Sequence, residues 1–316
     1  MNLSWLEDFF ALVATGNFSR AAEERHMTQP AFSRRVRALE EWVGTSLFDR
    51  TSHPVTLTPA GAWFRGAAQE LTARMARLPG EARAVAEAQS TTLRFAATHA
   101  LSFTFLPRWL RGMESCTAVG PVTLVSDVMA RCEAMLIESR VQFVLSHAHM
   151  QVSSQLAADG HPFARVGTDM LIPVSAPDAH GRPVHEITRA SSAAPLLLLS
   201  YSAESGIGRI LRELRGQALD RSPTQSVFTA HLASVLRTMA LDGRGLAWLP
   251  QSLIAEDLAS ARLVAAAPPD WSVELELRLY RDRSPMGKAG EAFWSAVQGR
   301  CEGVVHPMHG TAHGAG

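Results

Sequence analysis

The segment that decides the fold is residues 9–61, which read FFALVATGNFSRAAEERHMTQPAFSRRVRALEEWVGTSLFDRTSHPVTLTPAG. A helix is predicted to lead into it from residue 4 to residue 15, because apolar residues recur there at helical spacing. They share one stripe: Leu6, Phe9, Phe10 and Val13. Gly16 and Asn17 end this helix, and Ser19 is expected to cap a short second helix. The segment therefore begins with two short helices joined by a tight turn.

A third helix is predicted after Thr28, because the first turn of a helix tolerates a proline such as Pro30. Its inward stripe is Phe32, Val36, Leu39 and Val43. Its other side carries amide, hydroxyl and guanidinium groups, which suit DNA bases and phosphates: Gln29, Ser33, Arg34, Arg35 and Arg37. A merely solvated face is the alternative. The position of this helix, second in a helix-turn-helix, favours the DNA interpretation because that helix meets the major groove.

A short wing is predicted after the third helix. Residues 47–50 and 55–57 read as two short strands on either side of a polar turn that contains Pro54. Thr58 and Pro59 then begin another helix. Residues 1–58 are therefore predicted to form a winged helix-turn-helix domain.

The quoted segment resembles the LysR-type transcriptional regulators over its whole length and in order. The resemblance implies a sequence-specific DNA-binding regulator whose partners are a double-stranded DNA operator and further copies of the chain, in a dimer or tetramer. RNA polymerase is a further candidate partner. Arg50 and its wing neighbours would touch the DNA backbone or the minor groove. The complete predicted DNA-binding set is Ser19, Arg20, Thr28, Gln29, Pro30, Ser33, Arg34, Arg37 and Arg50.

Residues 59–90 are predicted to form a linker helix. Its larger apolar residues recur at a spacing typical of a helix-on-helix seam: Phe64, Ala67, Leu71, Met75 and Leu78. Packing on its own domain is the alternative, whereas the resemblance implies a dimerisation helix that pairs two DNA-binding heads. Pro79 and Gly80 interrupt the pattern, so a kink or an early stop is expected there.

Residues 91–300 are predicted to form an α/β domain with a largely parallel sheet, because short apolar strands alternate with helical stretches. The resemblance implies a two-lobed effector domain like that of periplasmic binding proteins. Lobe I would comprise residues 91–162 and 269–300, and lobe II residues 163–268. Residues 301–316 are rich in His, Gly and Ala and are predicted to form a disordered tail.

An effector site is predicted where strands end and helices begin, because ligands of α/β sheets bind beyond the carboxyl ends of the strands. Thr98, His99 and Ser102 stand at one helix N-terminus, whose free amides suit an anion or carboxylate. For each candidate the alternative is a helix cap or a satisfied loop side chain. The other candidates are Ser146, His147, Tyr201, Ser202, Thr229, His231 and Trp248.

The signal itself has two candidate forms, a bound small molecule or an oxidant. AATHALSFTFLP, LLLSYSAESGIGR and MALDGRGLAWLP resemble the hypochlorite-responsive branch of the family. The chain has 11 methionines, among them Met113, Met129, Met135 and Met239, whose thioethers oxidants convert to sulfoxides. Methionine at helical spacing is more often core. Cys116 and Cys132 are a rival sensor pair, for which ordinary reduced thiols are the alternative.

Other function classes lack a motif. Lys+Arg and Asp+Glu number 30 each, so bulk charge does not indicate nucleic-acid binding and any DNA contact depends on local placement. No signal peptide or membrane-spanning apolar run is evident, which predicts a cytoplasmic protein without a membrane partner. No catalytic, metal or cofactor motif is present, so no enzyme activity, metal or cofactor is predicted. A solute-binding or enzymatic α/β module fused to a DNA-binding head is the alternative of another class.

Overall fold

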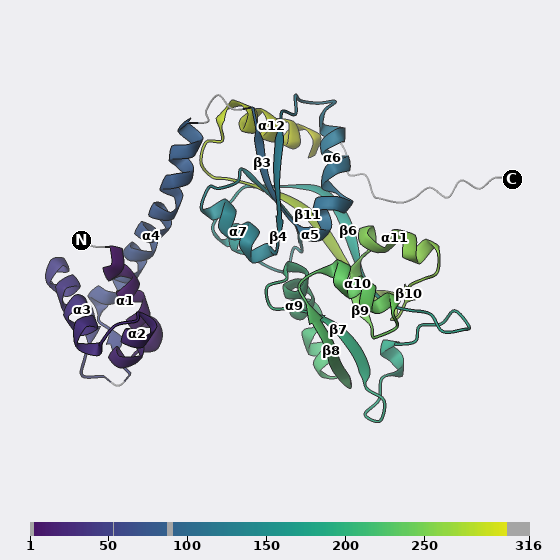
Figure 1. Cartoon of the computed structure of the whole chain (residues 1–316), viewed down its shortest axis with the longest axis horizontal. Coiled ribbons are helices and arrows are strands. Elements are labelled where there is room, and N and C mark those ends of the chain that lie inside the picture. Colours follow the sequence, from purple (N-terminus) through teal and green to yellow (C-terminus); the bar gives the residue numbers. More distant parts are fainter. Residues whose placement is uncertain (1–2, 53, 87–90, 302–316) are drawn as a thin grey trace. The chain divides into compact units, whose positions relative to one another are not determined.

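The structure is a computed structural model of the 316-residue chain and describes residues 3–52, 54–86 and 91–301. It divides into two compact units, Met1–Leu78 and Pro79–Gly316 (Figure 1). Besides most of α4 (Pro59–Ala86), the first unit contains three helices and a two-stranded wing, as the sequence predicts: α1 (Leu3–Thr15), α2 (Phe18–Glu24), α3 (Gln29–Val43), β1 (Phe48–Asp49) and β2 (Thr56–Leu57). The two wing strands pair antiparallel, with Phe48 opposite Leu57.

The cap of α2 differs from the prediction. Asn17, not Ser19, is the N-cap, and its Oδ1 accepts hydrogen bonds from Ser19 N at 2.9 Å and Arg20 N at 3.1 Å. Asn17 has an extended backbone, which directs its side chain back over the first turn and satisfies two amides that lack intrahelical partners. Thr28 is the N-cap residue of α3, as expected.

An aromatic cluster holds the first unit together. Phe9 is fully buried, and its ring centroid lies 5.2 Å from that of Phe48 and 5.1 Å from that of Phe64. The wing and the start of α4 (Pro59–Ala86) therefore pack on α1. On α1 the buried apolar residues are Leu6, Phe9 and Leu12, whereas Phe10 and Val13 are only partly buried.

The helix α4 passes through Pro79, so the expected early stop is wrong. Gly80 has a packing role: a Cβ placed on it would lie 2.4 Å from Ser139 Cβ and 2.6 Å from Glu138 O. Only a residue without a side chain permits this close approach to the loop after α7 (Met129–Ile137). Of the predicted 59–90 linker, residues 87–90 lie outside the described part of the chain.

The second unit is built on a mixed seven-stranded sheet of order β10-β6-β11-β5-β3-β4, with β9 pairing on β6. Its members are β3 (Leu93–Thr98), β4 (Val122–Asp127), β5 (Phe143–Ala148), β6 (Phe163–Ser175), β9 (Ala247–Pro250), β10 (Val264–Ala265) and β11 (Val273–Arg281). A separate parallel pair consists of β7 (Leu196–Tyr201) and β8 (Thr224–Ala230). The expected largely parallel sheet is wrong, because the long strands β6 and β11 run antiparallel to each other and to β5, β9 or β10.

Helices cover these strands (Figure 1). Besides α7 they are α5 (His99–Thr104), α6 (Leu106–Met113), α8 (Gln155–Ala158), α9 (Gly206–Asp220), α10 (Ala233–Leu241), α11 (Gln251–Ala259) and α12 (Gly287–Cys301), with 3-10 turns at Ile187–Arg189 and Pro269–Trp271. Two of them, α5 and α6, follow β3 in direct succession. Residues 302–316 of the predicted tail lie outside the described part of the chain.

Two lobes with separate apolar cores confirm the two-lobed fold. Lobe I is centred on Phe95, Phe143 and Phe293, and lobe II on Leu236 and Trp248. The strands β6 and β11 contribute to both cores: Ala164, Leu277 and Leu279 lie in the core of lobe I, and Leu171, Val174, Val273 and Leu275 in that of lobe II. Because the same two strands run through both lobes, they connect lobe I to lobe II.

Candidate functional site

The outer face of α3 carries the predicted DNA-binding residues into solvent. Gln29, Arg34 and Arg37 are exposed, and Ser33 is half-buried. Four more residues of the predicted set are exposed, and they lie at the starts of α2 and α3: Ser19, Arg20, Thr28 and Pro30. Three-dimensional structure thus gathers the set on accessible parts of two adjacent helices, where amide, hydroxyl and guanidinium groups are available to a duplex.

Two arginines near this surface are engaged inside the domain. Arg35 Nε lies 2.7 Å from Oδ2 of Asp8, whose side chain is 1% exposed, so Arg35 links α3 to α1 and does not face outward with Arg34. Arg50 Nη2 lies 2.6 Å from Glu40 Oε2, and its guanidinium stands 5.3 Å from the Phe18 ring centroid. Glu40 Oε1 also accepts from the backbone N–H of Leu47 at 2.9 Å. Arg50 therefore helps to hold the wing on α3.

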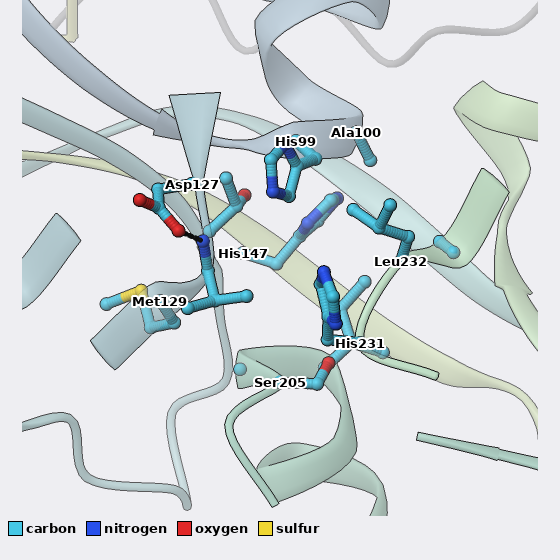
Figure 2. Close-up of a pocket in the computed structure, with 13 residues that line it drawn as sticks. His99, Ala100, Asp127, Met129, His147, Ser205, His231 and Leu232 are labelled. Atoms are coloured by element: carbon cyan, nitrogen blue, oxygen red, sulfur yellow. Dashed lines mark hydrogen bonds between the residues drawn. The ribbon is translucent and has the colours of Figure 1, made fainter. Parts of the chain in front are cut away.

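A small pocket of about 40 Å³ lies between the two lobes (Figure 2). Lobe I contributes His99 from α5 and His147 from β5, and lobe II contributes His231 from the segment before α10. The remaining lining residues are Thr98, Ala100, Asp127, Val128, Met129, Ser205, Gly206, Ile207, Leu232 and Ala233. Both lobes thus face the same space, which is called the interlobe pocket below.

His99 and His231 approach each other across the interlobe pocket. Their ring centroids are 6.1 Å apart. His99 Nδ1 shares a hydrogen bond of 3.0 Å with Ser126 Oγ, which in turn bonds Ser102 Oγ at 2.9 Å. Burial lowers the pKa of His99, Asp127 opposes this effect and His231 adds to it, so the net shift is downward. His99 is therefore expected to be neutral at pH 7.

His147 is held from behind by a buried carboxylate. Its Nε2–H donates to Asp169 Oδ2 at 3.3 Å, and Asp169 also accepts from Ser252 Oγ at 2.6 Å and from Met170 N at 2.8 Å. Burial alone would raise the pKa of Asp169, but the hydrogen bond and charge of His147 and the bonds from Ser252 lower it overall. His147 is 5% exposed, and its Nδ1 has no hydrogen-bond partner among the residues that the structure describes.

Three helices begin at the interlobe pocket. The N-cap residues of α7, α9 and α10 are Val128, Ser205 and Leu232, and all three line it. The first amides of a helix have no intrahelical acceptor, and its N-terminus carries partial positive charge. The pocket therefore combines backbone donors with imidazoles, an environment that favours negative charge.

The predicted effector residues separate into distinct places. Thr98, His99, His147 and His231 line the interlobe pocket, and Ser102 lies behind it, bonded to Ser126. Ser146 is buried next to His147 in β5, where successive side chains point to opposite faces. Tyr201 and Trp248 line a different cavity of about 220 Å³ within lobe II. Ser202 and Thr229 line neither of these cavities.

Sequence reasoning missed several lining residues, notably Asp127, Met129 and Ser205. Ser205 could have been found, since a serine followed by glycine before a helical stretch is a common N-cap signal. Met129 was weighed only as an oxidant target, and no sequence signal placed it beside Gly206. A Cβ added to Gly206 would lie 3.0 Å from Met129 Cβ, so the two lobes meet closely here.

Potential metal ligands and cysteine thiols are two further kinds of side chain that can carry chemistry. Within residues 3–52, 54–86 and 91–301, no cluster of three or more His, Cys, Asp or Glu side chains is arranged to hold a metal ion. In the same ranges no helix has the length and apolar character needed to cross a membrane. Burial raises the pKa of the Cys132 thiol to about 12, which keeps it protonated and unreactive, whereas Cys116 is exposed.

Comparison with protein families decides the identity. Residues 3–62 match the model of the bacterial regulatory helix-turn-helix protein, lysR family, and residues 86–302 match the LysR substrate binding domain. The chain belongs to the LysR family of transcriptional regulators. It is therefore a DNA-binding regulator with an effector-binding domain, as the resemblance of residues 9–61 predicts.

Relatives of this LysR-type regulator match it along most of its length. It is 29% identical to the regulator YjiE of Escherichia coli strain K12, over 93% of both chains, and 30% identical to BbuR of Bordetella bronchiseptica, over 88% of this chain and 83% of that one. Both relatives are named HTH-type transcriptional regulators.

Solved structures of family members have the same fold. DarR of Vibrio fischeri, solved in complex with DNA, has a TM-score of 0.54 at 29% identity, with 94% of this chain and 98% of that one covered. HypT of Salmonella typhimurium, described as a hypochlorite-specific LysR-type regulator, has a TM-score of 0.56 at 26% identity, with 96% and 100% covered. The DarR structure thus shows a relative of this similarity bound to DNA, and the HypT structure shows one at full length.

Proposed function

We propose that this LysR-type regulator changes its DNA binding when a small molecule occupies the interlobe pocket. The observation that carries the proposal is that side chains from both lobes face the same 40 Å³ space. A ligand that contacts His147 on one lobe and the N-terminus of α9 on the other binds the closed arrangement more tightly than an open one. Its binding energy would then shift the population of lobe arrangements and, through the dimer, the spacing of the heads.

For the DNA contact we propose that α3 enters the major groove with Gln29, Ser33 and Arg34 toward base edges. Their exposure or partial exposure supports this assignment. Arg20 and Arg37 would contact phosphates. Arg50, which bonds Glu40, would contribute to the wing contact with the part of its side chain that remains accessible, 34%.

We further propose that the chain acts as a homodimer, or a pair of dimers, joined through α4. Three large apolar side chains on that helix are exposed: Trp63 at 73%, Leu71 at 46% and Leu78 at 46%. Exposed apolar side chains at helical spacing are typical of a surface that another helix covers. Two heads joined in this way would read two half-sites of an operator.

An oxidant is the second candidate signal. Met129 lines the interlobe pocket and is packed against Gly206 of the other lobe, so conversion of its thioether to a sulfoxide would disturb the lobe contact. The relative from Salmonella typhimurium is described as hypochlorite-specific. The high pKa of Cys132 argues against that thiol as the sensor.

The test begins with purified full-length protein and a library of genomic DNA fragments, from which bound fragments are sequenced. Affinity for the selected fragment is then measured with and without candidate ligands or oxidants. We expect a ligand-dependent change that a Ser205→Trp substitution, which fills the interlobe pocket, abolishes. A Met129→Leu variant distinguishes oxidation from ligand binding. Affinity that is insensitive to every ligand and oxidant, in wild type and variants alike, would reject the proposal.

A further inference from the structure

We infer that the effector is a small monovalent anion and that its binding places a proton on His147. This inference rests on the proposed function, because it names the ligand class of the same interlobe pocket and the way in which pH regulates it. It depends on four features: helix N-termini, the orientation of His147, the size of the pocket and the surrounding charges.

Three helix N-termini meet at the interlobe pocket. The helices α7, α9 and α10 span Met129–Ile137, Gly206–Asp220 and Ala233–Leu241, and the N-cap residue of each lines the pocket. Ser205 Oγ accepts from Gly208 N at 3.2 Å, which leaves earlier amides of α9 available to a ligand. Since the helices come from both lobes, one anion placed among them interacts favourably with each.

His147 provides an independent observation. The side chain is 2% exposed, and its Nδ1 is a buried polar atom without a partner among the described residues. Figure 2 shows the ring of His147 between those of His99 and His231, in the middle of the pocket. A buried polar atom without a partner is costly, so Nδ1 is expected to have a ligand as its partner in the functional complex.

The hydrogen bond to Asp169 determines what Nδ1 can do. Because Asp169 is ionised and accepts from Nε2–H, a neutral His147 presents a lone pair at Nδ1. A lone pair repels an anion. When His147 takes a proton from solvent, Nδ1 becomes an N–H donor, and Asp169 balances the positive charge of the imidazolium from behind. Anion and proton therefore bind together.

The other two histidines are less suited to this role. His99 Nδ1 is already bonded to Ser126 Oγ at 3.0 Å, and burial together with His231 keeps its pKa low. The ring of His231 lies 6.1 Å from that of His99, so a proton on either disfavours a proton on the other. His147 alone of the three has a carboxylate bonded behind it among the described residues.

The size of the pocket restricts the ligand. A water molecule needs about 10–15 Å³ of such space, so a cavity of about 40 Å³ holds a ligand about the size of three water molecules. Nitrate, formate and halide ions fit this limit, whereas aromatic carboxylates and sugar phosphates do not. The apolar residues Ile207 and Leu232 complete the wall and disfavour a heavily hydrated dianion.

The charged groups around His147 comprise a carboxylate at the pocket that opposes an anion and two ion pairs whose charges already balance. Asp127 lies at the edge of the pocket, with its Oδ1 accepting from Val128 N at 2.7 Å (Figure 2). From β11, Glu276 and Arg278 flank Leu277, the residue opposite His147, and pair with each other at 2.6 Å. Glu133 of α7 and Arg209 of α9 likewise form a pair. Asp169, His99 and His231 are the other titratable side chains that bond His147 or line the pocket with it. The same elements also carry Arg94 (β3), Arg131 and Cys132 (α7), Arg212, Glu213 and Arg215 (α9), and Glu274 and Arg281 (β11), none of which lines the pocket.

The predicted pH dependence follows from linkage. The anion stabilises the protonated form of His147, so affinity is highest at low pH. It falls as pH rises toward the value at which His147 in the complex loses its proton. For one linked proton the decrease is at most about tenfold per pH unit.

The experiment uses the full chain and sodium nitrate, with sodium formate as a second probe and sodium gluconate holding ionic strength constant. Titration calorimetry in two buffers of different ionisation enthalpy counts the protons taken up. We expect proton uptake of up to one proton per anion, and affinity that falls as pH rises. His147→Asn keeps an N–H near the place of Nδ1 but does not titrate, so about one proton fewer should be taken up and the pH dependence should flatten.

Controls separate this role from a structural one. His161→Asn changes a second buried histidine of the same domain that does not line the pocket, and it should behave as wild type. Asp169→Asn retains His147 but removes its counter-charge, so the decrease in affinity should move to lower pH. This second variant keeps the inference testable if His147→Asn does not fold.

Distinct results identify which proposal fails. Nitrate binding without proton uptake, or uptake that His147→Asn leaves unchanged, overturns the inference. Failure of both anions to bind, while another ligand still alters operator affinity in a Ser205-dependent way, overturns it and leaves the proposed function standing. Proton-linked nitrate binding without any change in operator affinity supports the site and rejects the proposed function.

Discussion

Arg209 of lobe II and Glu133 of lobe I form an ion pair between the lobes, with 3.2 Å between Nη2 and Oε1. The Glu133 side chain is 3% exposed, and the same oxygen accepts from Gln155 N at 3.1 Å. A carboxylate buried to this degree requires such partners. The pair joins α7 to α9, the two helices whose N-termini face each other at the interlobe pocket, so it stabilises the lobe arrangement in which the pocket exists.

Replacing Arg209 should weaken this arrangement. Arg209→Met leaves Glu133 buried without its cation, which would cost about 3–5 kcal/mol in a fully buried pair. Because the Arg209 side chain is 38% exposed, we expect a smaller loss, about 1–2 kcal/mol in the free energy of unfolding by urea. Arg212→Met, on the same helix, removes an exposed guanidinium that only donates to Ser202 O and Ala203 O at 3.3 Å, so it should cost less, about 0.5 kcal/mol. Equal losses in both variants would show that the pair contributes nothing specific.

Gly206 should control how closely the lobes approach. In Gly206→Ala the new Cβ would lie 3.0 Å from Met129 Cβ, which is too close without a shift of a few tenths of an ångström. We expect ligand affinity to fall by about tenfold, equivalent to about 1.4 kcal/mol. In the matched variant Gly216→Ala, on the same helix, no described atom lies within 4 Å of the added Cβ, so affinity should be unchanged. Indistinguishable affinities would rule out close lobe contact at Gly206.

The buried carboxylate of Asp8 should be essential to the head. It pairs with Arg35 at 2.7 Å and with Arg25 at 3.0 Å, and so joins α1 to α2 and α3. Asp8→Ala leaves two arginines without their shared anion. We expect the free energy of unfolding of the head to fall by about 3 kcal/mol, as measured by thermal denaturation. Glu7→Ala is the control, because the Glu7 side chain is 62% exposed and its pairing with Arg25 is screened. A larger loss for Glu7→Ala would contradict this assignment.

Arg34 should contribute to sequence recognition. Arg34→Ala is expected to weaken binding to the selected operator by about 1–3 kcal/mol and to relax base preference at one position, if the guanidinium reads a base edge. Binding is measured by fluorescence anisotropy over a series of salt concentrations. Arg244→Ala, an exposed arginine of the effector domain, controls for the loss of one positive charge. If affinity instead falls equally for all DNA sequences, and depends less steeply on salt concentration than in wild type, Arg34 contacts a phosphate.

Acid should destabilise the effector domain partly through Asp169. The pKa of this carboxyl is lowered below 3.8 in the folded protein, so its contribution to stability is present above about pH 4 and is lost as pH falls through the folded value. We expect the urea midpoint of wild type to fall more steeply below pH 4 than that of Asp169→Asn, which has no such carboxyl to protonate. Parallel curves for the two proteins would show that Asp169 does not contribute to the acid transition.

Much of the DNA-binding head could be predicted from the sequence because its signals are local. The stripes of α1 and α3, the proline near the start of α3 and the polar turn of the wing all lie within a few residues of the elements they specify. Errors arose where partners are more distant or compete. Ser19 and Asn17 both suit an N-cap, and Arg35 looked like a DNA contact until the fold placed Asp8 beside it.

The interlobe pocket could be predicted only in outline. His99 and His147 were found because strand ends of an α/β fold converge on a cleft, and both lie at such ends. Tyr201 satisfied the same rule, yet its hydroxyl donates to Trp248 O at 2.9 Å and its side chain lines a separate cavity. The ends of the strands indicate where in the fold a ligand site lies. The register of each strand decides whether a given side chain points into that site.

The amino-acid sequence alone indicated the family, the helix-turn-helix, the alternation of strands and helices, and the histidines at strand ends. These depend on periodicity and on neighbours close in sequence. Only the folded chain decided that Asp169 and Ser252 stand behind His147, that α7, α9 and α10 begin around one pocket, and that Glu133 meets Arg209. The physical reason is that β6 and β11 carry both lobes, so residues separated by tens of positions become partners only after those strands pair.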